Sequence, residues 1–268
     1  MKLRPTVSQK SGGPKSNYSS VSIAMFEANI SIWPFFHTES VEDRRKYIIK
    51  VFLEFAGFVL IGFVHWILML TLLQDWFLDL VREHSSALLL AFVIGIFLLL
   101  LFAISKPLRK MAFVNWVITF TILECLVVSL SVLIISSGIL YMLAGFLIVA
   151  VVIVFSCLTA ALMPLDLTGT GIYLYMLATG AYMLSLYSMV LYTVLEVTWG
   201  FYLFATMIAC VVIIFLMYHV QCIMGGRRAS TSLFDDKFAA LLLFHEFVGL
   251  FVLTLYWRPI MQRLQLKQ

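Results

Sequence analysis

Residues 138–163 read GILYMLAGFLIVAVVIVFSCLTAALM and contain no Asp, Glu, Lys or Arg. A helix needs about 20 apolar residues to cross the roughly 30 Å hydrocarbon core of a bilayer, so this stretch is long enough to span a membrane. Further apolar runs lie on both sides of it, at residues 48–73, 87–105, 112–136, 171–195, 197–224 and 238–257. Every run should be an α-helix, because an open strand would leave backbone groups unpaired in lipid and the alternation of a β-barrel is absent. The predicted fold is therefore an all-α integral membrane protein with about seven transmembrane helices.

The overall composition agrees with a chain that lies mostly in lipid. Of its 268 residues, 63% are hydrophobic and 12% are charged, far from the averages of soluble proteins. The four cysteines lie in or beside apolar runs without metal-ligand spacing, so neither disulfides nor a structural zinc site is expected. We predict a mostly disordered cytoplasmic tail at residues 1–47, a helical bundle at 48–257 and a short basic tail at 258–268. The bilayer is the expected partner, and nothing in the sequence indicates nucleic acid.

The distribution of charge predicts the orientation, because basic residues in short loops mark the cytoplasmic side. Basic residues precede the first run and lie between the second and third and between the sixth and seventh runs, whereas acidic residues dominate after the first. The N-terminus is therefore predicted to be cytoplasmic, and the N-x-S sequons at Asn17 and Asn29 should stay unmodified. The basic residues after the last run would then lie on the wrong side. Either one run is wrongly assigned, or the short last run, with His245 and Glu246 at its midpoint, is broken or re-entrant.

Ionisable groups inside the apolar runs are candidates for function, because a charge in the middle of a bilayer is costly. Glu54 and His65 fall within about 20° of one face of the first predicted helix, where they could line a polar stripe. The alternative is a pair of Lys50 with Glu54, in which the lysine extends to the membrane surface.

The third run supplies two further candidates. Glu124 shares a helix face with Thr121 and Ser131, so it is expected to point into the bundle, either as a supporting polar residue or as a hydrogen-bonded packing residue. Asn115 is a second supporting polar residue in the same run. Both would assist a polar path without forming its centre.

His219 and Glu246 are the main candidates. They lie near the end of the sixth run and in the middle of the seventh, and a compact loop joins these two runs. An imidazole beside a carboxylate titrates near physiological pH and could gate a path by forming or losing an ion pair. The alternative is a static structural pair.

Five motifs in order resemble the BAX inhibitor-1/Lifeguard family over about residues 43–257. They are RRKYIIKVF at 44–52, FTILE at 120–124, LDLTGTG at 165–171, YHVQCIMGG at 218–226 and FAALLLFHEFVGLF at 238–251. The resemblance implies a helical membrane fold with a central seventh helix, residence in the endoplasmic reticulum or Golgi membrane, and a pH-sensitive calcium leak that restrains apoptosis. It also implies an acidic pair on the sixth and seventh helices.

The sequence departs from that family pattern at two places. His219 occupies the first acidic position and Glu246 the second, so the pair contains only one carboxylate. Calcium prefers several oxygen ligands, so Glu246 would form a weak calcium site at best, with Ca²⁺ binding transiently. The second run, ALLLAFVIGIFLLLLFAIS, contains no basic residue to match the arginine that bacterial members place there.

Two functional hypotheses follow from this pattern. The first is a calcium leak gated by His219 and Glu246, and the second is a non-conducting scaffold that acts through cell-death or calcium-handling membrane proteins. An enzyme is not expected, because His245-Glu246 lacks the second histidine of HExxH and no GxSxG motif occurs. A seven-helix receptor is not expected either, because its characteristic motifs are missing from the corresponding spans.

Overall fold

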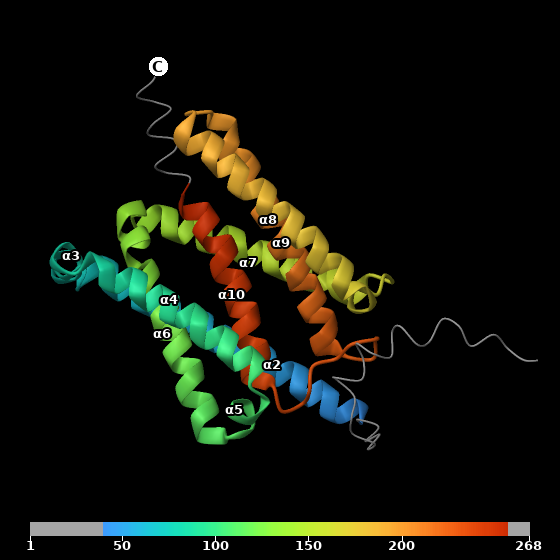
Figure 1. The fold of residues 1–268 in the computed structure, drawn as a ribbon. Coiled ribbons are helices and arrows are strands. Elements are labelled where there is room, and N and C mark those ends of the chain that lie inside the picture. The colour runs from blue at the N-terminus through green and yellow to red at the C-terminus, as the bar shows by residue number, and fades with distance from the viewer. Residues whose placement is uncertain (1–39, 257–268) are drawn as a thin grey trace, which may run out of the picture. The chain divides into compact units, whose positions relative to one another are not determined.

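Seven helices long and apolar enough to cross a membrane make up most of residues 40–256, the part of the chain that the computed structural model describes. They are α2 (Val41–Thr71), α4 (Ser85–Ile104), α6 (Ala112–Ser137), α7 (Ile139–Leu162), α8 (Gly171–Val194), α9 (Thr198–Met224) and α10 (Asp236–Leu255) (Figure 1). No strand occurs within these residues. The prediction of an all-α protein with about seven transmembrane helices is confirmed.

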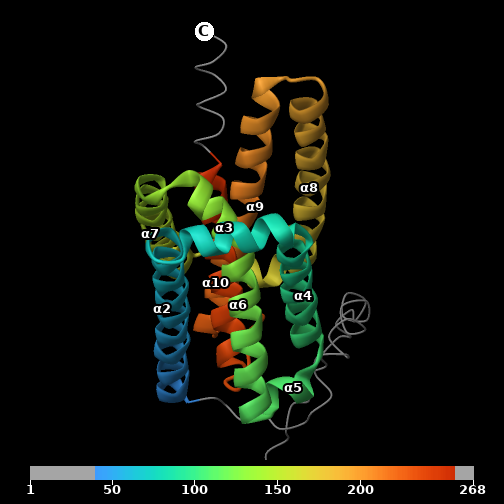
Figure 2. The same cartoon turned by 90° about the vertical axis from the view of Figure 1, so that its left-hand side faces the viewer.

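Three short helices connect the long ones, in segments that lie between the predicted apolar runs. They are α3 (Gln74–Glu83), α5 (Lys106–Lys110) and the 3₁₀ turn η1 (Leu167–Thr170). In Figure 2, α3 runs across the bundle between α2 and α4, and α5 lies at the opposite end. The helix α3 buries Phe77 and leaves Trp76 and Leu80 exposed, as an amphipathic helix at a membrane surface would.

The first helix begins at Val41, earlier than the predicted position 48, because its start is capped and anchored. The hydroxyl oxygen of Ser40 accepts a hydrogen bond from the backbone N–H of Asp43 at 3.0 Å, which satisfies one of the free donors of the first turn. Arg44 and Tyr47 are both buried and reach Thr231, at its carbonyl oxygen and its hydroxyl respectively. Residues 1–39 and 257–268, with both sequons and the basic tail, lie outside the described residues.

The helix α10 is the most buried of the seven and packs against α2, α6, α7 and α9. Gly62 of α2 lies against the ring of Phe244, and Trp66 stacks on Phe251 with ring centroids 5.0 Å apart. The indole N–H of Trp66 donates to the carbonyl oxygen of Val127 on α6 at 3.1 Å, so a polar atom in the core is satisfied. The predicted short, central seventh helix is confirmed.

The broken or re-entrant form of that prediction is wrong. α10 is continuous from Asp236 to Leu255, a length of about 30 Å that is sufficient to cross a bilayer. Its carboxyl end lies beside the end of α6, where the hydroxyl of Ser137 donates to the carbonyl oxygen of Leu255 at 3.3 Å. A break in the helix therefore does not account for the expected conflict in loop charge.

Two glycines permit close turns and close packing. Gly138 joins α6 to α7 in a tight turn with a φ of 85°, a conformation that glycine adopts without strain. The helix α8 packs mainly on α9, and there Gly200 allows the backbones to approach: a Cβ at this position would lie 2.6 Å from the carbonyl oxygen of Ser188. This close approach forms the α8/α9 hairpin.

Candidate functional site

His219 of α9 and Glu246 of α10 contact each other inside the bundle. The ring nitrogen Nδ1 of His219 meets Oε1 of Glu246 in a direct hydrogen bond or ion pair. Glu246 is buried and His219 is 22% exposed, so the imidazole is the partner with access to its surroundings. The prediction that adjacent helices bring these residues together is confirmed.

The second carboxylate oxygen of Glu246 has no hydrogen-bond partner among the described residues. This atom, Oε2, is buried, as is Nδ1 of the adjacent His245, which also lacks a partner there. A buried carboxylate oxygen without a donor is costly, so Glu246 depends on His219 for its stabilisation. The neighbours of Glu246 along α10 are mostly apolar, and Phe244 and Phe247 flank it in the sequence with stacked rings.

Gln221, two residues after His219, fixes the loop between α7 and α8. The side-chain oxygen of Gln221 accepts from the backbone N–H of Leu167 at 2.9 Å, and its amide donates to the carbonyl oxygen of Leu165 at 3.0 Å. Asp166 accepts from the hydroxyl and the backbone N–H of Thr168, and these hydrogen bonds hold the pKa of Asp166 below its usual value. The LDLTGTG and YHVQCIMGG motifs therefore lie together, although they are far apart in the sequence.

Charged residues also meet at the start of α10, where we define the α10 charge cluster as Lys50, Glu54, Asp236 and Lys237. Lys50 pairs directly with Asp236, while Nζ of Lys237 lies 3.1 Å from Oδ2 of Asp236 and 3.6 Å from Oε1 of Glu54. The ammonium of Lys237 also sits 4.5 Å from the centre of the Trp116 ring. The Lys50–Glu54 pair that the sequence suggested is replaced by pairs that join α2 to α10.

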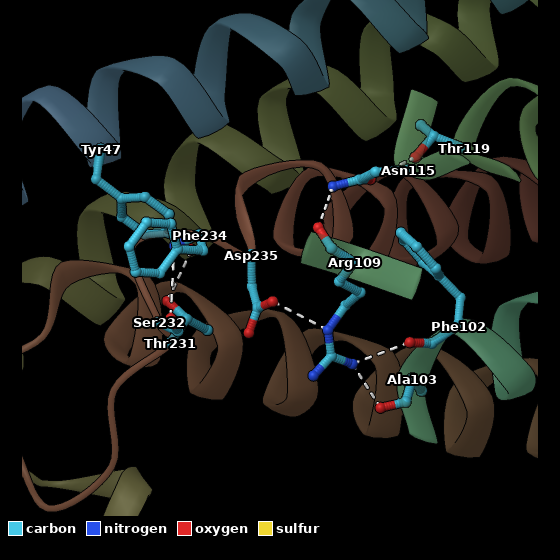
Figure 3. Close-up of polar contacts among 10 residues, drawn as sticks. All are labelled: Tyr47, Phe102, Ala103, Arg109, Asn115, Thr119, Thr231, Ser232, Phe234 and Asp235. Atoms are coloured by element: carbon cyan, nitrogen blue, oxygen red, sulfur yellow. Dashed lines mark hydrogen bonds and ion pairs between the residues drawn. The ribbon is translucent and has the colours of Figure 1, made fainter. Parts of the chain in front are cut away.

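Arg109 of α5 extends the charged region toward α4 (Figure 3). Its Nε lies 2.9 Å from Oδ1 of Asp235, and its Nη1 donates to the carbonyl oxygens of Phe102 and Ala103. These carbonyls belong to the last turn of α4, and the carbonyl groups of a last turn have no backbone N–H donor within their own helix. The predicted supporting residue Asn115 is buried and donates to the carbonyl oxygen of Arg109 at 2.7 Å, so it holds the turn between α5 and α6.

Glu124 and His65 form a second pair, between α6 and α2. Nδ1 of His65 lies 3.7 Å from Oε1 of Glu124, and the two side chains are 41% exposed for Glu124 and 33% for His65. Glu124 therefore stands at the edge of the bundle and does not point fully into it as predicted. The predicted stripe of Glu54 and His65 is not continuous either, since Glu54 contacts α10 whereas His65 contacts α6.

Within residues 40–256, no three His, Cys, Asp or Glu side chains come close enough to hold a metal ion. The weak calcium site at Glu246 stays a prediction. Comparisons with family models, with curated proteins and with solved structures gave no match. The helices and their buried polar pairs define the chain as an all-α multi-pass membrane protein, and the resemblance to the BAX inhibitor-1/Lifeguard family stays a prediction.

The role of the charges at the start of α10 was not predicted from the sequence. A signal was present, because Asp235, Asp236 and Lys237 stand directly before the most apolar part of the last run. Charged residues at the start of a buried helix need partners on neighbouring elements. What the sequence did not supply was the identity of those partners, because Glu54 and Arg109 come from helices far away along the chain.

Proposed function

We propose that this protein is a pH-gated cation leak of an intracellular membrane, with the His219–Glu246 pair as its gate and calcium as the ion carried. The contact between these two side chains is the observation that carries the proposal. It joins α9 to the central helix α10, which also packs on α2, α6 and α7.

The gate follows from the chemistry of the pair. A protonated imidazole forms an ion pair with the carboxylate and holds α9 against α10. When His219 loses its proton, Glu246 keeps a negative charge with no counter-charge on its partner, and its second oxygen already lacks a donor. A carboxylate in that state attracts water and cations, which favours an open path.

The choice of calcium and of an intracellular membrane rests on the resemblance of the five motifs. The single carboxylate at the pair implies a weaker leak than two carboxylates would give, because calcium prefers several oxygen ligands. Lower calcium in the store would then restrain apoptosis. The orientation that we propose, with the start of α2 in the cytoplasm, is supported by basic residues at that end of the bundle, including Arg44, Arg45, Lys106, Arg109, Lys110, Arg227 and Arg228.

Calcium efflux from liposomes that contain the purified protein tests this function, measured from about pH 5 to pH 8, the range in which histidine titrates. We expect efflux to increase as the pH rises across this range, because loss of the imidazole proton removes the ion pair. Glu246→Gln should abolish efflux, and His219→Asp should increase it by adding a second carboxylate. Glu83→Gln, which alters an exposed carboxylate on α3, is the matched control and should leave efflux unchanged. Efflux with intact pH dependence in Glu246→Gln would contradict the proposal.

A second candidate is a non-conducting membrane regulator that acts through a partner protein. The replacement of one acidic residue of the pair by His219 favours it, because this change removes both an oxygen ligand and a negative charge. No efflux from the unmodified protein, but efflux gained with His219→Asp, would indicate this function. Co-purification of a partner in a fixed ratio would then identify the protein through which it acts.

A further inference from the structure

A cavity of about 430 Å³ opens beside the α10 charge cluster, where α5 joins α6 and α10 begins. Its polar lining consists of Lys50, Arg109, Lys110, Asn115, Asp236 and Lys237. Its volume lies within the range of small-ligand sites, about 300–1,000 Å³. Neither the leak nor its gate uses this cavity, because His219 and Glu246 are not among the residues that line it.

The charge of the lining favours an anion. Four of the lining side chains are basic and one, Asp236, is acidic. Two further carboxylates, Asp235 and Glu54, pair with Arg109 and Lys237, so one positive charge remains in excess. Arg109 and Lys237 are buried and held by ion pairs, so their positions are fixed before any ligand binds. Lys110 is exposed and can turn toward a ligand. Lys50 is 58% exposed and pairs with Asp236, and its ammonium has further N–H donors for a ligand. Fixed donors combined with one mobile lysine form a suitable arrangement for a phosphate ester.

Aromatic side chains around the cavity place it at the level of the lipid headgroups. Phe234 lines the cavity and is 74% exposed, and Phe113, in the first turn of α6, is 80% exposed. Trp116 lies one turn further along α6, under the ammonium of Lys237. Trp and Tyr side chains gather at the interface between membrane and water, so the partly exposed Trp116 marks this level. Basic pockets between membrane helices bind acidic headgroups there.

We propose that this cavity binds the phosphate group of an anionic phospholipid from the adjacent leaflet. Lys110 and the remaining N–H donors of Lys50 contact the phosphate oxygens, while Arg109 and Lys237 stay with their acidic partners and hold the wall of the cavity in place. The lipid is favoured over a soluble phosphate ester because exposed aromatic side chains border the cavity. A bound headgroup would join α2, α5, α6 and α10, the elements that supply the lining residues.

Native mass spectrometry of the purified full chain, mixed with phosphatidylinositol 4-phosphate or with phosphatidylcholine, tests the proposal. The anionic lipid should bind in preference to phosphatidylcholine, and Lys110→Gln should weaken its binding about fivefold, the effect of losing one hydrogen bond to the phosphate. Lys106→Gln is the matched control, because Lys106 is an exposed lysine of the same short helix that does not line the cavity. Lys106→Gln should change the affinity for phosphatidylinositol 4-phosphate by less than about twofold.

Each alternative outcome has a defined meaning. Equal weakening by Lys110→Gln and Lys106→Gln would overturn the proposal, because it would show general attraction to a basic surface. Equal binding of the two lipids would overturn it as well. In a second arm, soluble inositol 1,4-bisphosphate is added to the protein in phosphatidylcholine nanodiscs. If the soluble ester binds as tightly as the lipid does, and Lys110→Gln abolishes this binding, the proposal of a lipid ligand is overturned. The cavity would then be assigned to a soluble phosphate ester.

Discussion

Lys237, the second residue of α10, reaches across to Glu54 of α2, with its ammonium 3.6 Å from the carboxylate. Both side chains are nearly buried, at 9% and 11% exposure. The pair therefore fixes the start of the central helix against the first transmembrane helix. Removal of Lys237 takes the ion-pair partner from Glu54 in an environment with little water, whereas Lys237 would keep Asp236 if Glu54 were removed.

The Lys237–Glu54 pair gives the first prediction. Lys237→Met should lower the free energy of unfolding by about 3 kcal/mol, because it leaves Glu54 charged and unpaired. Adding Glu54→Gln should restore part of that loss by removing the stranded charge. Thermal and denaturant unfolding in detergent micelles measures the two single variants, Lys237→Met and Glu54→Gln, and the double variant.

Lys46→Met is the control for this cycle. Lys46 pairs with Glu42 on the exposed surface of the same helix, and such pairs contribute less than about 1 kcal/mol. If the double variant loses as much stability as the sum of its single variants, Lys237 and Glu54 are not coupled, and the interpretation of the pair is wrong.

The role of Arg109 gives the second prediction. Its guanidinium reaches Asp235 and the carbonyl oxygens at the end of α4 at the same time, which the single ammonium of lysine cannot do. Arg109→Lys should therefore lower stability by about 2 kcal/mol, as loss of buried charged hydrogen bonds does. Arg45→Lys, at an exposed position at the same end of the bundle, should have no measurable effect. Equal stability of these two variants would contradict the capping role.

The close approach of α8 and α9 gives the third prediction. Gly200→Ala should destabilise the protein by about 1–3 kcal/mol, because the new methyl group meets the backbone of α8 and the helices must separate. Gly180→Ala is the matched control on α8, where a Cβ would meet nothing within 4 Å. It should be neutral or slightly stabilising, since alanine favours a helix over glycine by up to about 1 kcal/mol. The melting temperatures of the two variants compare these effects directly.

The proposed orientation gives the fourth prediction. In sealed endoplasmic reticulum vesicles with the cytoplasmic face outward, a membrane-impermeant maleimide should label Lys110→Cys but not Glu83→Cys, compared with the unmodified chain. Both positions are exposed and lie at opposite ends of the bundle, in α5 and α3. Asn17 and Asn29 should also stay without glycans when the protein is expressed in cells. Labelling of Glu83→Cys alone would reverse the orientation.

The sequence predicted the membrane helices well because length and apolar character alone decide them. It also predicted the contact of His219 with Glu246, because adjacent spans joined by a compact loop usually pack together. The helix start at Val41 carried a local signal that was not used: Ser40 and Asp43 have the spacing of a capping motif. Local patterns of this kind can be read without knowledge of the fold.

The remaining contacts depend on which helices become neighbours. Glu54 meets Lys237, and Lys50 meets Asp236, only because α2 packs on α10, and nothing in either helix alone encodes that choice. The exposure of Glu124 was likewise misjudged, because a polar face on one helix does not reveal whether a neighbour covers it. The amphipathic helix α3 was missed because its polar residues resemble those of a loop.

The central position of α10 has a consequence for biosynthesis. Six transmembrane helices precede it in the chain, so the ribosome completes them before the helix that contacts most of them exists. Until α10 emerges, Glu54 and His219 have neither Lys237 nor Glu246 as partners. Final assembly must therefore follow insertion of the individual helices. A chain stalled before residue 236 would retain unpaired polar groups in lipid, which quality-control machinery can use to distinguish incomplete chains from finished ones.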